Sequence, residues 1–214
     1  MGRFSYELLQ KAVPSETLAK YNTIVETGTL FGDGAELMSK HFKTVHTIEI
    51  QDSLYEKAKV RFQGNPGIQC HNGDSVDVLA SLAPTLATPT VFFLDAHWSG
   101  DSSVDWVNSE WKGYTVNTGY RGTNPIDPKN QNPLLEEIDI LVKTVRGEFI
   151  LYVDDTEKFD AAGNGLRNRC FIGEDWTHLS LQKLEATLGT RLVSKHKTHD
   201  QIVYIVSHDV MSSQ

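Results

Sequence analysis

The sequence has few of the features that mark secreted, membrane-spanning or nucleic-acid-binding proteins. Its 214 residues include two cysteines, Cys70 and Cys170, which lie too far apart for a CxxC metal or redox motif. No apolar run approaches the roughly 18 residues that cross a bilayer, and no basic segment followed by an apolar one opens the chain. The net charge of −8, with scattered basic residues, disfavours a phosphate backbone as partner. We expect a cytoplasmic protein that binds neither membrane nor nucleic acid.

Two phosphate-binding signatures are also missing. No GKS or GKT tripeptide is present, which excludes a P-loop. The glycines Gly28, Gly32 and Gly34 follow a GxxxGxG spacing rather than GxGxxG, so the pyrophosphate fingerprint of dinucleotide-binding proteins is absent. An NAD-linked enzyme is therefore a disfavoured alternative.

The residues that are present predict one α/β domain spanning 1–214. Hydrophobic residues make up 39% and charged residues 22%, as in ordinary globular proteins. Short β-branched runs alternate with amphipathic helical stretches, which predicts βαβ units and a parallel sheet. Strands are expected at 23–26, 45–50, 68–71, 90–94 and 149–153, and helices at 34–42, 133–145 and 179–188. Ser15 and Asp52 are expected to cap two further helices, and Asp74 to open another as its cap. An antiparallel pair is expected at 191–197 and 201–206.

Two segments fall outside this alternation. Residues 1–21 are expected to form a helical lead-in. Residues 98–131 show no clear periodicity but are rich in aromatic residues, whereas disordered segments are normally poor in them. We predict a lid or substrate wall there, with five candidate substrate contacts: Trp98, Trp106, Trp111, Tyr114 and Tyr120. The alternative is a surface excursion that packs on the body or on a second subunit of a homodimer.

The ends of four of the expected strands carry polar or flexible residues: Glu26-Thr27-Gly28, Glu49, Asp95 and Asp154-Asp155. Ligands of open parallel sheets bind beyond the carboxyl ends of the strands, so these residues predict a binding site. Gly28 permits a close backbone approach to a ligand because it has no Cβ. Glu49, 21 residues beyond Gly28, is suitably placed to accept hydrogen bonds from the ribose hydroxyls of an adenine nucleoside.

With these motifs the sequence resembles class I S-adenosylmethionine (SAM) methyltransferases. The matching stretches are Val25–Thr29 with Gly32–Gly34, Thr47–Glu49, Asn72–Ser75 and Phe93–His97. The resemblance implies a Rossmann-like fold, with a mostly parallel seven-stranded sheet, a C-terminal antiparallel hairpin and helices on both faces. It implies that Glu26 and Gly28 face the methionine part, Glu49 the ribose, and Asp74 with Ser75 the adenine. The full set of implied cofactor-binding residues is Glu26, Thr27, Gly28, Thr29, Gly32, Asp33, Glu49, Ile50, Asp74, Ser75 and Asp95. A glutamate at the end of the first strand suits the SAM ammonium but would repel a pyrophosphate.

The residues beyond the cofactor resemble those of metal-dependent O-methyltransferases of the catechol and sugar types. Converging carboxylates of Asp95, Asp154 and Asp155 would form a hard oxygen site for Mg²⁺ or Mn²⁺. The run after the fourth strand is Leu94-Asp95-Ala96-His97-Trp98-Ser99, which lacks the lysine base of the catechol pattern. His97 instead falls where the sugar-type enzymes have an acid, and a histidine that titrates near neutrality is a competent base. We therefore predict Asp95 and His97 as catalytic residues.

Together these features predict an O-methyltransferase for a small hydroxylated acceptor, with a sugar or glycan unit favoured over a phenol. One alternative is a metal-free methyltransferase that acts on an amine or a carboxylate. Another is a SAM-binding protein without catalysis. The Asn/Asp-Pro-Pro-aromatic motif of enzymes that methylate nucleobase amino groups is absent after Leu94.

Overall fold

The chain is described here by a computed structural model, which covers residues 4–87, 89–97, 132–159 and 176–208. These residues contain a seven-stranded sheet in the order β3-β2-β1-β4-β5-β7-β6. The strands are β1 (Thr23–Thr27), β2 (Thr44–Glu49), β3 (Ile68–Asn72), β4 (Thr90–Leu94), β5 (Phe149–Val153), β6 (Leu192–Lys197) and β7 (Ile202–Val206). Strands β1 to β5 pair in parallel, while β7 is antiparallel to both β5 and β6. The predicted mixed sheet with a C-terminal hairpin is confirmed.

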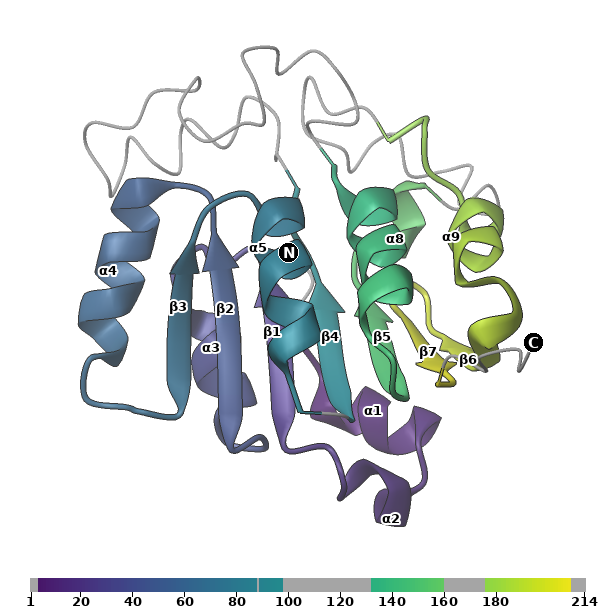
Figure 1. Ribbon diagram of the computed structural model, residues 1–214, viewed down its shortest axis with the longest axis horizontal. Coiled ribbons are helices and arrows are strands. Elements are labelled where there is room, and N and C mark those ends of the chain that lie inside the picture. Colours follow the sequence, from purple (N-terminus) through teal and green to yellow (C-terminus); the bar gives the residue numbers. More distant parts are fainter. Residues whose placement is uncertain (1–3, 88, 98–131, 160–175, 209–214) are drawn as a thin grey trace.

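Helices cover both faces of the sheet (Figure 1). One hydrophobic cluster joins the sheet to α1 (Tyr6–Ala12), α2 (Ser15–Leu18), α3 (Asp33–Met38) and α4 (Asp52–Phe62). A second cluster joins the opposite face to α5 (Ser75–Leu82), α8 (Leu134–Thr144) and α9 (Leu181–Leu188). The described residues also form three short 3-10 turns: η1 (Ala83–Thr85), η2 (Thr156–Lys158) and η5 (Gly189–Arg191).

The two central strands explain why the sheet sits in the middle of these layers. Every residue of β4 and β5 is buried, because helices lie on both sides. Along β4, Val91 and Phe93 belong to one cluster and Phe92 and Leu94 to the other. Each such side chain contributes roughly 1.5–3 kcal/mol when it is fully buried, so both strands are strongly held in register. This register brings the residues that follow β4 and β5 to one edge of the sheet.

The helix starts differ from the sequence predictions in three places. The chain forms α1 before α2, and the Ser5 side chain caps it by accepting from the Leu8 amide. Ser15 is the first residue of α2 rather than its cap, since Pro14 already occupies the cap position. Asp52 likewise lies inside the first turn of α4, after Gln51, where its negative charge still favours the helix N-terminus. Asp74 does cap α5, as predicted.

Some predictions fall on residues outside the described ranges. The 98–131 segment and its candidate substrate contacts Trp98, Trp106, Trp111, Tyr114 and Tyr120 lie there, as does Cys170. Among the residues that the structure does describe, no helix is both long enough and apolar enough to cross a bilayer.

The stacked pair His46 and His71 makes the folded state sensitive to acid. Their Nδ1 and Nε2 atoms lie 3.0 Å apart on β2 and β3. Burial lowers the pKa of His46 from 6.5 to about 4, and the nearby His71 adds to this shift. Burial lowers the pKa of His71 as well. Below pH 6.5 the unfolded chain therefore binds protons that the folded chain rejects, and stability falls as the pH drops towards 4. The His46 share is on the order of 3 kcal/mol.

Urea unfolding of wild type and His46→Gln at pH 7, 6, 5 and 4 measures this loss. We expect the wild type to lose more stability than the variant over this range, because glutamine does not titrate. The buried carboxyl groups contribute to both proteins alike and cancel in the difference. His208→Gln, at an exposed position, is the matched control. Equal slopes in wild type and His46→Gln would show that the pair has no such effect.

Candidate active site

The loop after β1 is held tightly against the end of β4. Gly28 has a φ of 88° there, and the amides of Gly28 and Thr29 both donate to the Ile48 carbonyl, at 3.0 and 3.1 Å. A Cβ on Gly28 would lie 2.9 Å from the carbonyl oxygen of Asp95. Glycine is therefore required at this position by both the backbone angle and the close approach. The contact joins the predicted cofactor loop to the predicted catalytic residues.

Glu26 is a buried carboxyl group at the base of this loop, with 3% of its surface exposed. Its Oε2 accepts a hydrogen bond of 2.7 Å from the Thr47 hydroxyl, which in turn lies 2.6 Å from the Thr29 hydroxyl. Burial raises the pKa of Glu26 to about 8, although the Thr47 bond acts in the opposite direction. A Cβ on Gly34 would overlap Glu26 Oε1, so α3 begins directly against this carboxyl group. Such a group favours a cationic ligand that compensates its burial.

Glu49 ends β2 and organises the neighbouring backbone. Its two oxygens accept from the Leu30 amide at 2.8 Å and the Gln51 amide at 2.9 Å. Burial raises the pKa of Glu49 to about 7, and these hydrogen bonds oppose the rise. A carboxylate oxygen has more than one lone pair, so both can still accept from a ligand hydroxyl. The next side chain, Ile50, is 36% exposed and offers an apolar surface beside the carboxylate.

The remaining predicted cofactor residues divide into two groups. Asp74 accepts from the Val76 amide at 2.9 Å as the cap of α5, and Ser75 beside it is buried. Asp33 instead lies at the surface, where its carboxylate pairs with Arg61 at 2.8 Å and is 77% exposed. The structure therefore does not bring Asp33 together with Glu26 or Glu49. Its helical position at the start of α3 turns the side chain outward, which the spacing of the glycines did not reveal.

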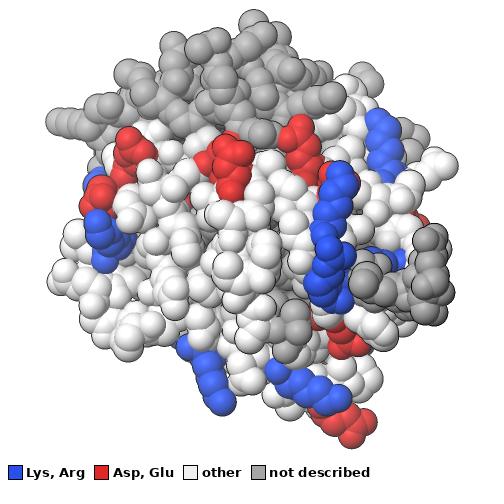
Figure 2. Space-filling view, in the orientation of Figure 1, with Lys and Arg blue, Asp and Glu red and all other residues white. Residues whose placement is uncertain are grey.

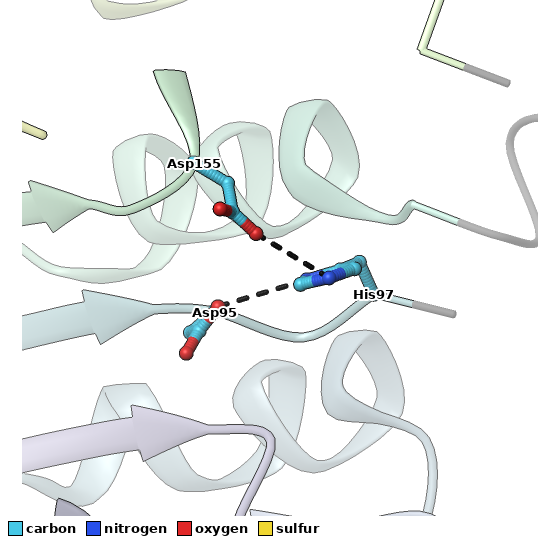
Figure 3. A group of neighbouring side chains, drawn as sticks. All are labelled: Asp95, His97 and Asp155. Carbon is cyan, nitrogen blue, oxygen red and sulfur yellow. Dashed lines mark ion pairs between the residues drawn. The ribbon is translucent and has the colours of Figure 1, made fainter. Parts of the chain in front are cut away.

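Asp95, His97 and Asp155 form a compact group beyond the ends of β4 and β5 (Figure 3). His97 lies between the two carboxylates, with Nδ1 3.6 Å from Asp95 Oδ1 and Nε2 3.3 Å from Asp155 Oδ2. The Asp95 amide donates to the Thr27 hydroxyl at 3.2 Å, which fixes the start of this loop on β1. Residues from the ends of β1, β4 and β5 thus converge.

The titration of this group differs from the sequence expectation. Burial lowers the pKa of His97 to about 4, and the charge of Asp155 opposes this shift only in part. Burial raises the pKa of Asp95 well above its ordinary value, and the nearby charges of Asp154 and Asp155 add to the rise. His97 is therefore neutral at pH 7 rather than half-protonated. A neutral imidazole can accept a proton, and its tautomer is set by the neighbours that bind its two nitrogens.

Lys158 belongs to the same group, and the sequence analysis missed it. Its Nζ lies 3.1 Å from Asp155 Oδ2 and 3.4 Å from His97 Nε2, and 7% of the side chain is exposed. The ammonium also lies 4.8 Å from the centre of the Trp176 ring, a cation–π distance. The pattern Asp155-x-x-Lys158 within a single 3-10 turn was the available signal.

Asp154 departs from the predicted metal set. Its Oδ1 accepts from the Gln201 amide group at 3.0 Å and from the Asp155 backbone amide at 2.9 Å, so it is directed to the β6–β7 turn. Among the described residues, carboxylates and imidazoles close enough to share an ion form two sets: Asp95 with His97 and Asp155, and Asp154 with Asp155 and Asp200. Burial raises the pKa of Asp154 to about 6, with a further contribution from Asp155. The expected trio of Asp95, Asp154 and Asp155 is not one of these sets.

The oxygen and nitrogen ligands of the first set suit Mg²⁺ or Mn²⁺ by type. However, the Lys158 ammonium already contacts Asp155 Oδ2 at 3.1 Å. A divalent ion bound to that oxygen would lie next to another positive charge. With Lys158 in this position the group does not fit a resident divalent ion.

Comparison with known proteins identifies the fold. No protein-family model and no curated protein matches the sequence. A solved structure from Klebsiella pneumoniae, provisionally described as an O-methyltransferase, superposes with a TM-score of 0.54 at 16% identity, covering 96% of this chain and 82% of that one. One from Staphylococcus aureus, provisionally described as a caffeoyl-CoA O-methyltransferase, gives 0.50 at 10% identity, covering 93% and 88%. Cofactor-bound Rv0187 from MTB gives 0.50 at 16% identity, covering 92% and 83%. The chain has the class I methyltransferase fold.

In this methyltransferase fold the charged residues are unevenly distributed. Figure 2 shows acidic side chains along the upper part of one face, which is the edge towards which β1 to β5 point in Figure 1. Glu26, Glu49, Asp95, Asp154 and Asp155 all lie at or just beyond the ends of those strands. An acidic strand edge favours a cationic ligand over a phosphate-bearing one.

Proposed function

We propose that this protein is a SAM-dependent methyltransferase that transfers a methyl group to a hydroxyl of a small acceptor. The observation that carries the proposal is the pair of buried glutamates, Glu26 and Glu49, at adjacent strand ends beside the glycine loop. Their raised pKa values fit a ligand that brings positive charge and hydroxyl donors to the same edge. SAM has both, and it has no phosphate that the acidic edge would repel.

In the proposed complex each part of SAM has a partner. Glu26 binds the ammonium of the methionine moiety, and Gly28 leaves room for the ligand beside the backbone. Glu49 accepts from the ribose hydroxyls, while the exposed Ile50 packs on the adenine. Asp74 and Ser75 at the start of α5 supply polar contacts to the adenine edge.

The acceptor hydroxyl is proposed to lie against Asp95 and His97. Neutral His97 accepts the proton that the hydroxyl loses as its oxygen attacks the methyl carbon, and the sulfonium leaves as a neutral thioether. Asp95 and Asp155 on either side orient the imidazole and stabilise its protonated form once it arises. Holding the nucleophile in line provides much of the rate acceleration. We favour a sugar or glycan acceptor over a phenol because the 98–131 segment is rich in aromatic residues.

Binding and transfer are tested separately. Calorimetry with SAM and with NAD⁺ on the purified chain is expected to show binding of SAM alone. Incubation with labelled SAM and a panel of sugars, glycans and phenols should then yield S-adenosylhomocysteine. We expect Asp95→Asn to lower kcat/KM by roughly 10²- to 10³-fold. SAM binding without product from any acceptor favours a non-catalytic SAM-binding protein, and NAD⁺ binding in place of SAM refutes the proposal.

A second candidate is the metal-assisted form of the same reaction. It is favoured by the Asp154, Asp155 and Asp200 set, whose carboxylates lie close enough to share an ion. Bound Mg²⁺ or Mn²⁺ would lower the pKa of an acceptor hydroxyl and polarise it. This form loses activity with a chelator and recovers it with added metal. Activity that survives the chelator indicates metal-free transfer. The acceptor panel then shows whether the methyl group goes to a hydroxyl, an amine or a carboxylate.

A further inference from the structure

Lys158 lies where the metal-dependent scheme requires a positive charge. We infer that the Lys158 ammonium is the built-in cation of the Asp95, His97 and Asp155 group and takes the place of a divalent metal ion. The catalytic role of Lys158 in this inference rests on the proposed function. The structural part, that the lysine occupies a cation site, stands on the geometry of the described residues.

The first step of the argument is distance. The Lys158 ammonium is 3.1 Å from Asp155 Oδ2 and 3.4 Å from His97 Nε2. A Mg²⁺ ion sits about 2.0–2.1 Å from its ligand oxygens. An ion on Asp155 Oδ2 would therefore lie within a few ångströms of the ammonium, in a buried place where screening by water is weak. Either the lysine or the dication can neutralise this oxygen, but not both.

The second step is the way the lysine is held. Asp155 adopts a left-handed backbone conformation, with φ 54° and ψ 27°, and its carbonyl accepts from the Lys158 amide at 3.0 Å. This turn folds the Lys158 side chain back over the Asp155 carboxylate. The ammonium also lies 4.8 Å from the centre of the Trp176 ring, and Phe159 stacks on that ring at 6.0 Å. A side chain with 7% exposure and these contacts is part of the site rather than a mobile surface lysine.

The third step is charge. The Asp95 and Asp155 carboxylates approach His97 from either side, at 3.6 and 3.3 Å, and a cation beside them offsets the charge that two buried acidic groups bring together. An ammonium next to the acceptor oxygen also stabilises the negative charge that develops when the hydroxyl loses its proton. The lysine thus supplies, from η2, the positive charge that a metal ion would supply.

Mn²⁺ titration of the full chain, followed by calorimetry and electron paramagnetic resonance, tests this inference without reference to activity. We expect wild type to bind Mn²⁺ no more tightly than millimolar at this site. Lys158→Met should gain at least tenfold in affinity, because it leaves the ligands without their cation. Lys158→Met/Asp155→Asn should lose that gain. Lys195→Met is the matched control, since Lys195 forms an exposed pair with Glu185 at 2.6 Å and should leave Mn²⁺ binding unchanged.

Two results would overturn the inference. One is micromolar Mn²⁺ binding by wild type that Asp155→Asn and Asp95→Asn each remove, because Asp95 belongs only to the group that holds Lys158. The other is a folded Lys158→Met with no gain in affinity. Lys158→Arg, which keeps the charge, covers the case in which Lys158→Met fails to fold: wild type and Lys158→Arg should both bind Mn²⁺ weakly and keep their SAM affinity in the presence of chelator. Calorimetry with SAM tests the proposed function independently of Mn²⁺ binding. A protein that does not bind SAM is therefore distinguishable from one in which the role assigned to Lys158 is wrong.

Discussion

A Gly28→Ala variant is expected to lose SAM binding and to be destabilised by about 2–4 kcal/mol. Alanine would have to adopt the φ of 88° at this position, and its Cβ would lie 2.9 Å from the Asp95 carbonyl oxygen. Both atoms in this overlap belong to backbone or are bonded directly to it, so no side-chain rotation can relieve it. The loop after β1 must therefore move away from the end of β4, which displaces Asp95 together with the cofactor loop.

Thermal unfolding and SAM calorimetry measure the two effects. Gly64→Ala is the matched control, because nothing lies within 4 Å of a Cβ at Gly64. We expect this variant to keep the stability and SAM affinity of wild type. If Gly28→Ala behaves like Gly64→Ala, the close approach of the two loops is not needed for folding or for binding.

SAM affinity is expected to rise with pH, by roughly tenfold per pH unit between pH 6 and pH 8. The pKa of Glu26 in the unliganded protein is raised by burial to about 8, so the group is mostly protonated at pH 7. An ammonium placed against Glu26 favours the ionised form, so binding releases a proton and tightens as the pH approaches 8. In the unliganded protein the raised pKa of Glu26 makes stability depend on pH in the opposite direction to SAM affinity. The folded state holds the proton more tightly than the unfolded state, so this contribution to stability declines as the pH rises towards 8.

Calorimetry at pH 6, 7 and 8 in buffers of different ionisation enthalpy counts the released protons. Glu26→Gln should bind SAM at least 30-fold more weakly at pH 8 and should flatten the pH profile. Glu185→Gln, which removes a surface carboxylate, is the matched control. Proton release that is equal in wild type and Glu26→Gln would assign the effect to another group, of which Glu49 is the nearest candidate.

The order of the elements could be read from the sequence because it depends on local patterns. The continuous apolar runs of β4 and β5 match the observed strands residue for residue. Such runs are apolar throughout because both faces of the strand are covered. The residues that follow a strand are then fixed at one edge of the sheet, so Glu26, Glu49 and Asp95 could be assigned to a common site. Helix starts were less accurate, since Asp and Ser favour both the cap position and the first turn.

The contacts inside the site could not be read in the same way. His97 and Lys158 are 61 positions apart, and their approach depends on the register of β4 against β5 and on the turn at Asp155. The outward direction of Asp33 depends on Arg61 of α4, and the direction of the buried Asp154 carboxylate depends on Gln201 of the terminal hairpin. Spacing along the chain carries no information about such partners.

The sequence by itself determined the α/β class, the parallel sheet closed by a hairpin, and the strand ends that carry Glu26, Glu49 and Asp95, because alternation and burial are local properties of the chain. The tertiary structure alone decided the charge of the candidate catalytic group. Packing surrounds His97 with low-dielectric material and keeps it neutral, and it delivers the Lys158 ammonium to Asp155 from a distant turn. Charge state depends on burial and on neighbours in space, and both exist only in the folded chain.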